Sequence, residues 1–272
     1  MLGYVLSYED ILAYYGEERE DVAEAIFRYG QDRDTVLVLD SATLSRGHGD
    51  GPGFNSPEQI TEIARESLSE FDERIPRKYP AFHGTVCRYT NAGFFKRDRR
   101  QIGTDMVFDI DIKTNYRETF RHAARIVNFL DRYDVPYRIK FSGNTSPHII
   151  LPCETFPQPF PKKEFQRLFK TIQEKSGAHD VDDSFCSSSG HFLRLPYSLN
   201  EHTGLVSLPL TREQFDVFEP GIAECGNVQV DDGWFQLPEN AHERMERFLV
   251  DMLGFSAEGA LAQQSKSNVS ST

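Results

Sequence analysis

The chain has 272 residues, of which 39% are hydrophobic and 26% charged, and its formal net charge is -12. This length and apolar content suit a globular protein with one large core or two closely packed ones. No apolar run approaches the roughly 18 to 20 residues of a membrane span, and the first residues lack the pattern of a signal peptide, so we expect a cytoplasmic protein.

Apolar residues recur at three- and four-residue spacing in five segments, which predicts helices. In chain order these are residues 8–29, with a break near Gly16, then 56–71, 116–133, 165–177 and 235–254. Short apolar or alternating runs predict strands over residues 35–40, 81–89, 107–112, 137–141, 148–151 and 203–208. Helical segments alternate with strands, which indicates an α/β sandwich with helices packed on a sheet.

Two further segments have loop composition. Residues 45–53 contain four glycines and a proline, so we expect a flexible loop, either a mobile lid or a plain surface excursion. Residues 256–272 are rich in Ser, Ala and Gln and are expected to be a disordered tail. The rest, 1–255, is expected to be a single domain with an N-terminal part up to residue 80 and a larger part from 81 to 255.

The four cysteines are scattered and form no Cys-x-x-Cys pair. They are Cys87, Cys153, Cys186 and Cys225. Neither a zinc site nor a disulfide framework is indicated, because both need paired or regularly spaced cysteines. We therefore expect reduced thiols in or near the core and no structural zinc.

Charge is distributed unevenly along the chain. Residues 77–148 carry a net charge of +7, from 14 basic and 7 acidic residues, whereas residues 1–76 carry -11 and residues 149–272 carry -8. Within the basic segment, Phe94-Phe-Lys-Arg-Asp-Arg-Arg100 mixes aromatic and basic side chains, as in surfaces that stack bases and neutralise phosphates. The candidate nucleic-acid contacts are Lys96, Arg97, Arg99 and Arg100. A solvated charged loop is the alternative interpretation.

The basic segment also contains the run Val107-Phe-Asp-Ile-Asp-Ile112. Its strict alternation is typical of a half-buried strand, with Val107, Asp109 and Asp111 on one face and the apolar residues on the other. Two carboxylates that share one face repel each other unless a cation lies between them, so a metal site is one hypothesis. An edge strand with a solvated face is the other.

Further polar residues follow in order. A turn at residues 142–147 joins two predicted strands into a hairpin that begins with Lys140 and ends with His148. His148 could be a structural histidine or a neutral donor to a substrate phosphate. Asp182 could complete a two-metal phosphoryl-transfer site with the two earlier aspartates, or could lie in a solvated acidic turn with its neighbours.

Taken together, these segments resemble the archaeo-eukaryotic primase superfamily, which includes small primase subunits, primase-polymerases and the polymerase domains of end-joining ligases. The superfamily's three motifs are Asp-x-Asp, Ser-x-His and a hydrophobic residue followed by Asp. Here they match Asp109 and Asp111, Ser146 and His148, and Val181 with Asp182. The segment Leu193-Arg-Leu-Pro-Tyr-Ser-Leu-Asn200 follows at the expected distance. The resemblance covers about residues 80 to 210 well and the N-terminal part only loosely.

The resemblance implies a catalytic sheet of the RNA-recognition-motif type packed against an N-terminal α/β unit, with the active site in the cleft between them. It implies that Asp109, Asp111 and Asp182 hold two Mg²⁺ or Mn²⁺ ions. Ser146 and His148 would contact the triphosphate of an incoming nucleotide. Arg194 would neutralise phosphate or pair with a catalytic aspartate, and Lys140 is added as a nucleotide contact because of its charge and position.

The expected function is that of a template-directed nucleotidyltransferase, a DNA or RNA primase-polymerase that joins an NTP or dNTP to a 3′-hydroxyl and releases pyrophosphate. Template, primer and nucleotide are the expected partners, with a ligase, a helicase or a large primase subunit as candidate protein partners. Small primase subunits usually carry a cysteine-rich zinc module, which this chain lacks, so a stand-alone primase-polymerase or a repair polymerase is favoured. The alternatives are a catalytically silent single-strand-binding module and a metal-dependent phosphohydrolase.

Overall fold

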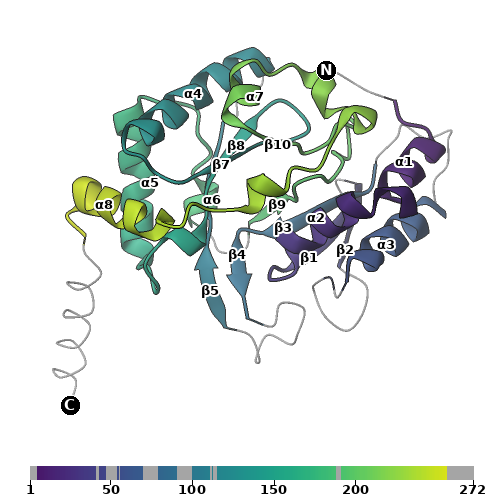
Figure 1. The fold of residues 1–272 in the computed structure, drawn as a ribbon, viewed down its shortest axis with the longest axis horizontal. Coiled ribbons are helices and arrows are strands. Elements are labelled where there is room, and N and C mark those ends of the chain that lie inside the picture. Colours follow the sequence, from purple (N-terminus) through teal and green to yellow (C-terminus); the bar gives the residue numbers. More distant parts are fainter. Residues whose placement is uncertain are drawn as a thin grey trace.

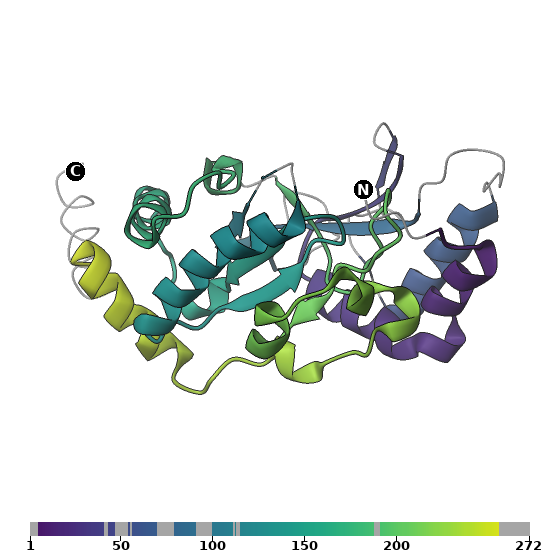
Figure 2. The same cartoon turned by 90° about the horizontal axis from the view of Figure 1, so that it is seen from above.

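The computed structural model describes residues 5–40, 43–46, 54, 56–69, 79–90, 100–110, 112, 115–187 and 191–255. The molecule is elongated, with one group of helices at each end and two four-stranded sheets between them (Figures 1 and 2). Every strand pairing is antiparallel. No described helix is long and apolar enough to cross a membrane.

The N-terminal unit places three helices beside the first sheet (Figure 1). The helices are α1 (Tyr8–Tyr15), α2 (Glu20–Gly30) and α3 (Pro57–Ser69). The sheet has the order β2-β1-β3-β9, with β1 (Thr35–Asp40), β2 (Thr43–Arg46), β3 (Ala81–Thr85) and β9 (Phe192–Arg194). This sheet therefore combines strands that are more than 100 residues apart in sequence, and β9 brings Arg194 to the first unit.

The second unit is built on the sheet β10-β7-β8-β6 and its helices. Its elements are β6 (Met106–Asp109), α4 (Tyr116–Arg132), β7 (Arg138–Phe141), β8 (Pro147–Leu151), α5 (Lys162–Ser176) and β10 (Pro209–Leu210). The succession β6-α4-β7-β8-α5 is followed by an isolated bridge between Ile110 and Val181. This is the β-α-β-β-α-β order of the RNA-recognition-motif type, with its last strand reduced to one bridge. The predicted fold class is confirmed.

Shorter elements complete the structure. A two-stranded hairpin, β4-β5, projects from between the two sheets (Figure 1). The elements are β4 (Cys87–Tyr89), β5 (Gln101–Thr104), α6 (Ser184–Ser187), α7 (Arg212–Asp216) and α8 (Ala241–Leu253), together with the 3₁₀ turns Glu17–Arg19, Cys153–Thr155, Pro220–Ala223, Cys225–Asn227 and Asp232–Phe235.

Local sequence signals explain where the main helices begin and end. Helix α1 begins with a reciprocal capping box between Ser7 and Asp10, and α4 begins where the Asn115 side chain accepts from the backbone of Glu118. Helix α5 ends at Gly177, which has a φ of 69°. That left-handed conformation costs glycine nothing, because it has no Cβ.

Both faces of the second sheet are covered near β6. On the helical face, the Phe108 ring stacks on Phe169 of α5 with centroids 4.6 Å apart. On the other face, Val107 is buried with Ile150 and with Leu193 from β9. The prediction of a half-buried strand is therefore wrong for the start of the run, because the N-terminal unit packs over it. Only Asp109, at the end of β6, is partly exposed.

Other predictions are corrected in detail. Residues 203–208 form no strand, because their backbone follows a turn held by Asn200 and pairs in one isolated bridge, between Leu199 and Val206, and only Pro209–Leu210 joins the sheet. The last helix begins at Ala241 and not at residue 235, after a 3₁₀ turn and Pro238. Of the glycine-rich segment, Ser45 and Arg46 belong to β2, and residues 47–53 lie outside the described residues, as does 256–272. All four cysteines are free and buried, as expected.

Candidate active site

Three predicted residues form a row across three strands of the second sheet. Asp109 of β6 pairs in register with His148 of β8, which pairs in turn with Lys140 of β7. Residues paired in this way point to the same face of a sheet. The His148 Nε2 atom lies 3.5 Å from Asp109 Oδ1. The hairpin predicted from the turn thus places its two polar ends beside the first aspartate.

Asp182 lies next to Asp109 through the backbone. Val181 bridges to Ile110, and the Asp182 N–H donates to the Asp109 carbonyl over 2.9 Å. The Asp182 side chain caps α6, where it accepts from the backbone and hydroxyl of Ser184 at 2.9 and 2.8 Å. Each carboxylate oxygen keeps a second lone pair after accepting one bond. The first and third aspartates of the predicted set are therefore neighbours.

The opposite wall of the site comes from the N-terminal sheet. His83 of β3 pairs in register with Arg194 of β9. The Arg194 guanidinium donates to the Ser142 carbonyl over 2.6 Å and forms a short ion pair with Glu201. Glu201 also lies 3.8 Å from His83 Nε2. The carboxylate partner of Arg194 is thus Glu201, which the sequence prediction did not include.

The turn between β7 and β8 carries Ser146 to the edge of this site. The Ser142 hydroxyl accepts from the backbone N–H groups of Asn144 and Ser146 and lies 3.3 Å from the Ser146 hydroxyl. Gly143 has a φ of 83°, and a Cβ there would lie 2.9 Å from both the Asn200 side chain and the Leu205 carbonyl. Only glycine suits this position, because it permits both the dihedral and the close approach.

Burial and neighbouring charges shift the pKa values of all three side chains in the row. Burial lowers the pKa of Lys140 well below its usual range, and the charge of Arg194 lowers it further. Burial and the charge of Lys140 lower the pKa of His148 despite the neighbouring Asp109, so the imidazole is held neutral. Burial raises the pKa of Asp109, but the His148 interactions, the Ser146 hydroxyl and the Lys140 charge outweigh it, and the pKa lies below its ordinary value.

On the opposite wall, burial and nearby charges also act on the pKa values of the side chains. Burial and the nearby charges of Arg194 and Lys140 lower the pKa of His83 to about 4, although Glu201 acts in the other direction. Burial raises the pKa of Glu201, but the nearby His83 imidazole and the Arg194 charge bring it well below its usual range. At neutral pH the site therefore holds charged carboxylates and a guanidinium beside two neutral imidazoles.

Buried polar atoms without hydrogen-bond partners are concentrated at this site. Among the described residues six side-chain atoms are in this condition, and four of them are Asp109 Oδ1, His148 Nδ1, Arg194 Nε and His83 Nε2. Lys140 is fully buried, and its side-chain nitrogen donates to the Ser207 hydroxyl over 2.8 Å. Such atoms are costly to bury and are rare in folded proteins away from ligand sites. A polar, charged ligand would supply the missing partners.

The residues fit a divalent cation. Asp109 Oδ1 accepts no hydrogen bond, and the adjacent Asp182 carboxylate is bonded only within its own turn. Carboxylate oxygens are the ligands that Mg²⁺ and Mn²⁺ prefer. Asp111, the remaining predicted ligand, lies outside the described residues.

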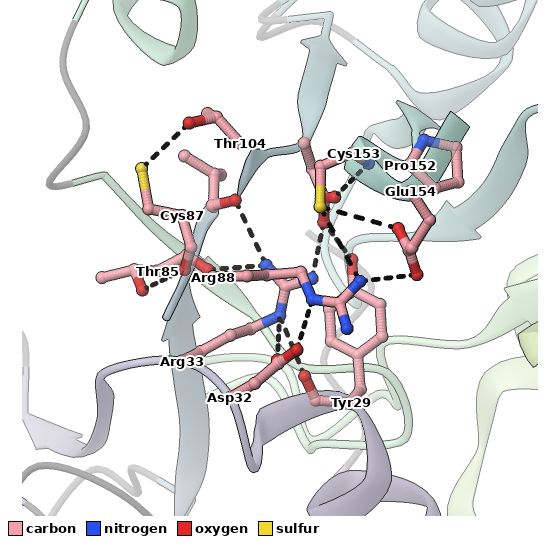
Figure 3. Close-up of polar contacts among 12 residues, drawn as sticks. Tyr29, Asp32, Arg33, Thr85, Cys87, Arg88, Thr104, Pro152, Cys153 and Glu154 are labelled. Carbon is pink, nitrogen blue, oxygen red and sulfur yellow. Dashed lines mark hydrogen bonds and ion pairs between the residues drawn. The ribbon is translucent and has the colours of Figure 1, made fainter. Parts of the chain in front are cut away.

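A second cluster contains potential metal ligands but is differently arranged (Figure 3). Ligand atoms of Asp105, Cys153 and Glu154 lie within 4.8 Å of one another. However, Asp105 accepts from Arg33 over 2.6 Å and from the Cys153 N–H over 2.9 Å, and Glu154 accepts from Arg88 at 2.6 Å. Burial raises the pKa of the Cys153 thiol, which keeps it protonated. The arginines take the places that a cation would need, so we interpret this cluster as an ion-pair network that joins the two units.

The remaining predicted contacts are mostly outside the described residues. These are Lys96, Arg97 and Arg99. Arg100 is described and exposed, just before β5. His83, Glu201 and Ser207 are site residues that sequence reasoning missed. His83 interrupts an apolar strand, which is the one sequence signal that could have identified it, whereas nothing local distinguishes Glu201 or Ser207.

Comparison with known proteins gives structural matches alone. No family model matches the sequence, and no curated protein is similar enough to match it. The structure is similar to the polymerase domain of Ligase D from Mycobacterium tuberculosis, solved in complex with DNA, with a TM-score of 0.53. The chain has the fold of that polymerase domain. The alignment covers 76% of this chain and 82% of the other, at 18% identity.

A second match is the primase-polymerase domain of cyanophage S-2L, with a TM-score of 0.40 and 12% identity over 75% of this chain and 94% of the other. The fold implied by the motif resemblance is therefore confirmed by the first match.

Proposed function

We propose that the chain is a metal-dependent, template-directed nucleotidyltransferase that joins an NTP or dNTP to a 3′-hydroxyl of nucleic acid and releases pyrophosphate. The observation that carries the proposal is the set of unpartnered buried polar atoms around Asp109, on a fold similar to that of a DNA-bound polymerase domain. Around these atoms, the site combines the carboxylates of Asp109 and Asp182 with the basic side chains of Lys140 and Arg194. A nucleoside triphosphate with its cation is complementary to both.

The residues of the row would have distinct roles. Asp109 and Asp182, with Asp111, would hold divalent cations, which supply charge neutralisation and activation of the attacking hydroxyl when bound. Lys140 and Arg194 would neutralise oxygens of the triphosphate, since the burial that strains Lys140 is relieved when an anion enters. His148 and His83 are held neutral, so each can donate one N–H to a phosphate or sugar oxygen without adding charge.

The priming, damage-tolerance and break-repair roles remain parts of this proposal, as do DNA or RNA as template and primer. The basic run before β5, which ends at the exposed Arg100, would contact backbone phosphates. The lack of paired cysteines favours a stand-alone enzyme over a zinc-containing primase subunit.

One set of reactions tests the proposal. The protein is incubated with Mn²⁺ and either ribo- or deoxynucleotides on a primed and an unprimed template. We expect products whose added nucleotides are complementary to the template, and the four combinations distinguish chain initiation from extension. Binding without incorporation would instead favour the silent module, and release of phosphate or mononucleotides without extension would favour the phosphohydrolase.

A matched pair of aspartate variants links the activity to the site. Asp182→Asn removes a proposed ligand, whereas Asp180→Asn changes an exposed residue two positions away. Asp180 has a φ of 60°, a conformation that asparagine tolerates well, so this variant should fold normally. We expect loss of incorporation in the first variant and full activity in the second. Equal activity in both would contradict the assignment of Asp182.

A further inference from the structure

A pocket of about 410 Å³ lies beside the candidate site but is separate from its polar row. Strand β5 forms one wall, the segment from Phe156 to Phe165 forms another, and α6 closes a third through Phe185 and Cys186. None of the residues that line it belongs to the nucleotide or metal ligands proposed above. The pocket is therefore a feature that the proposed reaction leaves unexplained.

The chemistry of the lining suits a planar heterocycle. Four phenylalanine rings contribute to it, from residues 156, 160, 165 and 185, and the rings of Phe156 and Phe160 lie 5.1 Å apart. Polar side chains lie among them, chiefly Gln101, Gln158 and Lys162. Pockets that bind small ligands combine mostly apolar walls with a few fixed polar groups. Aromatic rings stack on every nucleobase, because each base has a π-face.

The two glutamines are already oriented by the protein. The Gln101 side-chain nitrogen donates to the Thr104 hydroxyl over 2.8 Å, and the Gln158 side-chain nitrogen donates to the Cys153 carbonyl over 3.1 Å. With its nitrogen held in this way, each amide offers its carbonyl oxygen as an acceptor. Exocyclic amino groups and ring N–H groups of a base are the donors that such oxygens would bind.

One edge of the pocket is suited to a phosphate. Lys162 is exposed and is the first residue of α5, and the residue before it, Pro161, makes no side-chain cap to the helix. The first backbone N–H groups of the helix are thus without a side-chain acceptor, and the helix dipole favours an anion there. A base packed against the phenylalanine rings would carry its phosphate toward this end.

The pocket is linked to the candidate site through one short helix. Asp182 caps α6 through Ser184, and the next two residues of α6 line the pocket. The lining of the pocket therefore begins within one helical turn of a proposed metal ligand, a distance that neighbouring nucleotides of one strand can span.

We propose that this pocket binds one nucleotide unit, with its base against the phenylalanine rings and its phosphate at Lys162. The inference rests on the proposed function for its biological context but not for its chemistry. The nucleotide could come from an unstacked position of the bound nucleic-acid strand or from a free nucleotide, and binding experiments separate the two sources.

The experiment measures the affinity of the full chain for AMP and CMP by calorimetry, and for a fluorescent single-stranded oligonucleotide by anisotropy. Phe160→Leu keeps an apolar side chain but removes a stacking face, and we expect a loss of affinity of about tenfold. Lys162→Gln removes one phosphate contact and should weaken binding about threefold. Lys163→Gln is the matched control, because Lys163 is the next residue of α5, is also exposed, and does not line the pocket.

The two sources give different results. If the mononucleotides bind and show both losses, the ligand is a free nucleotide. If only oligonucleotide binding is weakened by the two substitutions, a series of oligonucleotides that each lack one base is tested. At one position, the missing base should reduce the affinity of the wild-type chain but not that of Phe160→Leu. Urea unfolding first shows that Phe160→Leu is folded. If neither Lys162→Gln nor the folded Phe160→Leu then changes the affinity for the mononucleotides or the oligonucleotide, the proposal is overturned.

The outcome is independent of the test of the proposed function. If the wild-type chain extends primers on a template and the pocket variants bind nucleotides normally, the pocket proposal is contradicted and the proposed polymerase function is supported. If the chain extends no primer but binds nucleotides in a way that the pocket variants weaken, the polymerase function is contradicted and the pocket proposal is supported.

Discussion

Two buried polar clusters of this molecule have similar residue types but opposite arrangements. In the network of Figure 3, Arg33 and Asp105 are almost fully buried, and their charges face each other at 2.6 Å with further bonds to Tyr29 and to backbone carbonyls. In the row at Asp109, two buried polar atoms have no partner, and two more on the opposite wall, from His83 and Arg194, have none either. A saturated cluster holds a structure together, whereas an unsaturated one keeps its binding capacity for a ligand.

The difference also concerns position. The network lies where the N-terminal unit meets the residues just before β6 and just after β8. The row lies at the opposite ends of the same two strands. The two strands are therefore fixed at one end by paired charges and carry unpaired charges at the other. We interpret the first cluster as stabilising and the second as functional, and four predictions test this distinction.

The largest effect is expected for Asp109→Asn. This substitution removes a proposed cation ligand, so the rate of primer extension should fall by about 10³-fold or more. The free energy of unfolding should change by no more than about 1 kcal/mol, because Asp109 Oδ1 accepts no hydrogen bond. Extension assays and urea unfolding of the same preparation measure both quantities. A large loss of stability with intact activity would reverse the assignment of the two clusters.

An aspartate-to-asparagine substitution in the network should instead lower the stability and leave the extension rate almost unchanged. Asp105→Asn removes the nearest counter-charge of the buried Arg33 guanidinium and leaves it only Asp32, 3.9 Å away, and breaking such a buried pair costs about 3 to 5 kcal/mol. The extension rate of the molecules that remain folded should stay within a few-fold of wild type. Urea unfolding checks the first expectation and activity per folded molecule checks the second. An unchanged unfolding midpoint would show that the network does not join the units.

A third prediction concerns pH and His83. The folded chain protonates this histidine only near pH 4, whereas an unperturbed histidine protonates near pH 6.5. Above pH 6.5 neither state binds the proton, and between 6.5 and 4 only the unfolded state does, so stability falls as the pH falls through this window. The contribution is about 3 kcal/mol, and it levels off below pH 4.

Replacement of His83 by glutamine should remove this contribution. We expect the free energy of unfolding of His83→Gln to fall less steeply from pH 6.5 to 4 than that of wild type. His179→Gln, at an exposed position, serves as the control and should leave the slope unchanged. Parallel curves for wild type and His83→Gln would contradict the burial-driven shift.

The smallest effects are expected for Lys140→Met. The buried Lys140 side chain donates to one neutral acceptor, the Ser207 hydroxyl, so an apolar side chain of similar length should raise the free energy of unfolding by about 1 to 2 kcal/mol. Loss of a charge-assisted contact to the triphosphate should raise the KM for the nucleotide about tenfold. A variant that is more stable yet binds nucleotide less well would support a functional role. Lower stability with unchanged KM would indicate a structural lysine.

Local patterns in the sequence predicted much of the fold. The apolar spacing predicted the segments that form the six longest described helices, with α1 and α2 as one segment broken near Gly16, and the Ser142-Gly-Asn turn predicted the hairpin that pairs Lys140 with His148. Asp109 was identified because alternation is a property of the strand itself. The covered face of β6 was missed, because the residues that cover it come from another unit.

The opposite wall of the site was harder to predict for the same reason. His83 and Arg194 meet through the pairing of β3 with β9, across more than 100 residues of sequence, and Glu201 reaches them from an irregular segment. No local periodicity encodes such a contact. The resemblance to primase motifs supplied Arg194, but its partner Glu201 required the structure.

Cation binding at Asp109 tests the central claim most directly, because it does not depend on turnover. Mn²⁺ binding can be followed by electron paramagnetic resonance, with and without a non-hydrolysable nucleoside triphosphate, in wild type, Asp109→Asn and Asp105→Glu. The account predicts that wild type and Asp105→Glu bind Mn²⁺ more tightly when the nucleotide is present, and that Asp109→Asn loses this binding. Equal Mn²⁺ binding by wild type and Asp109→Asn would contradict it.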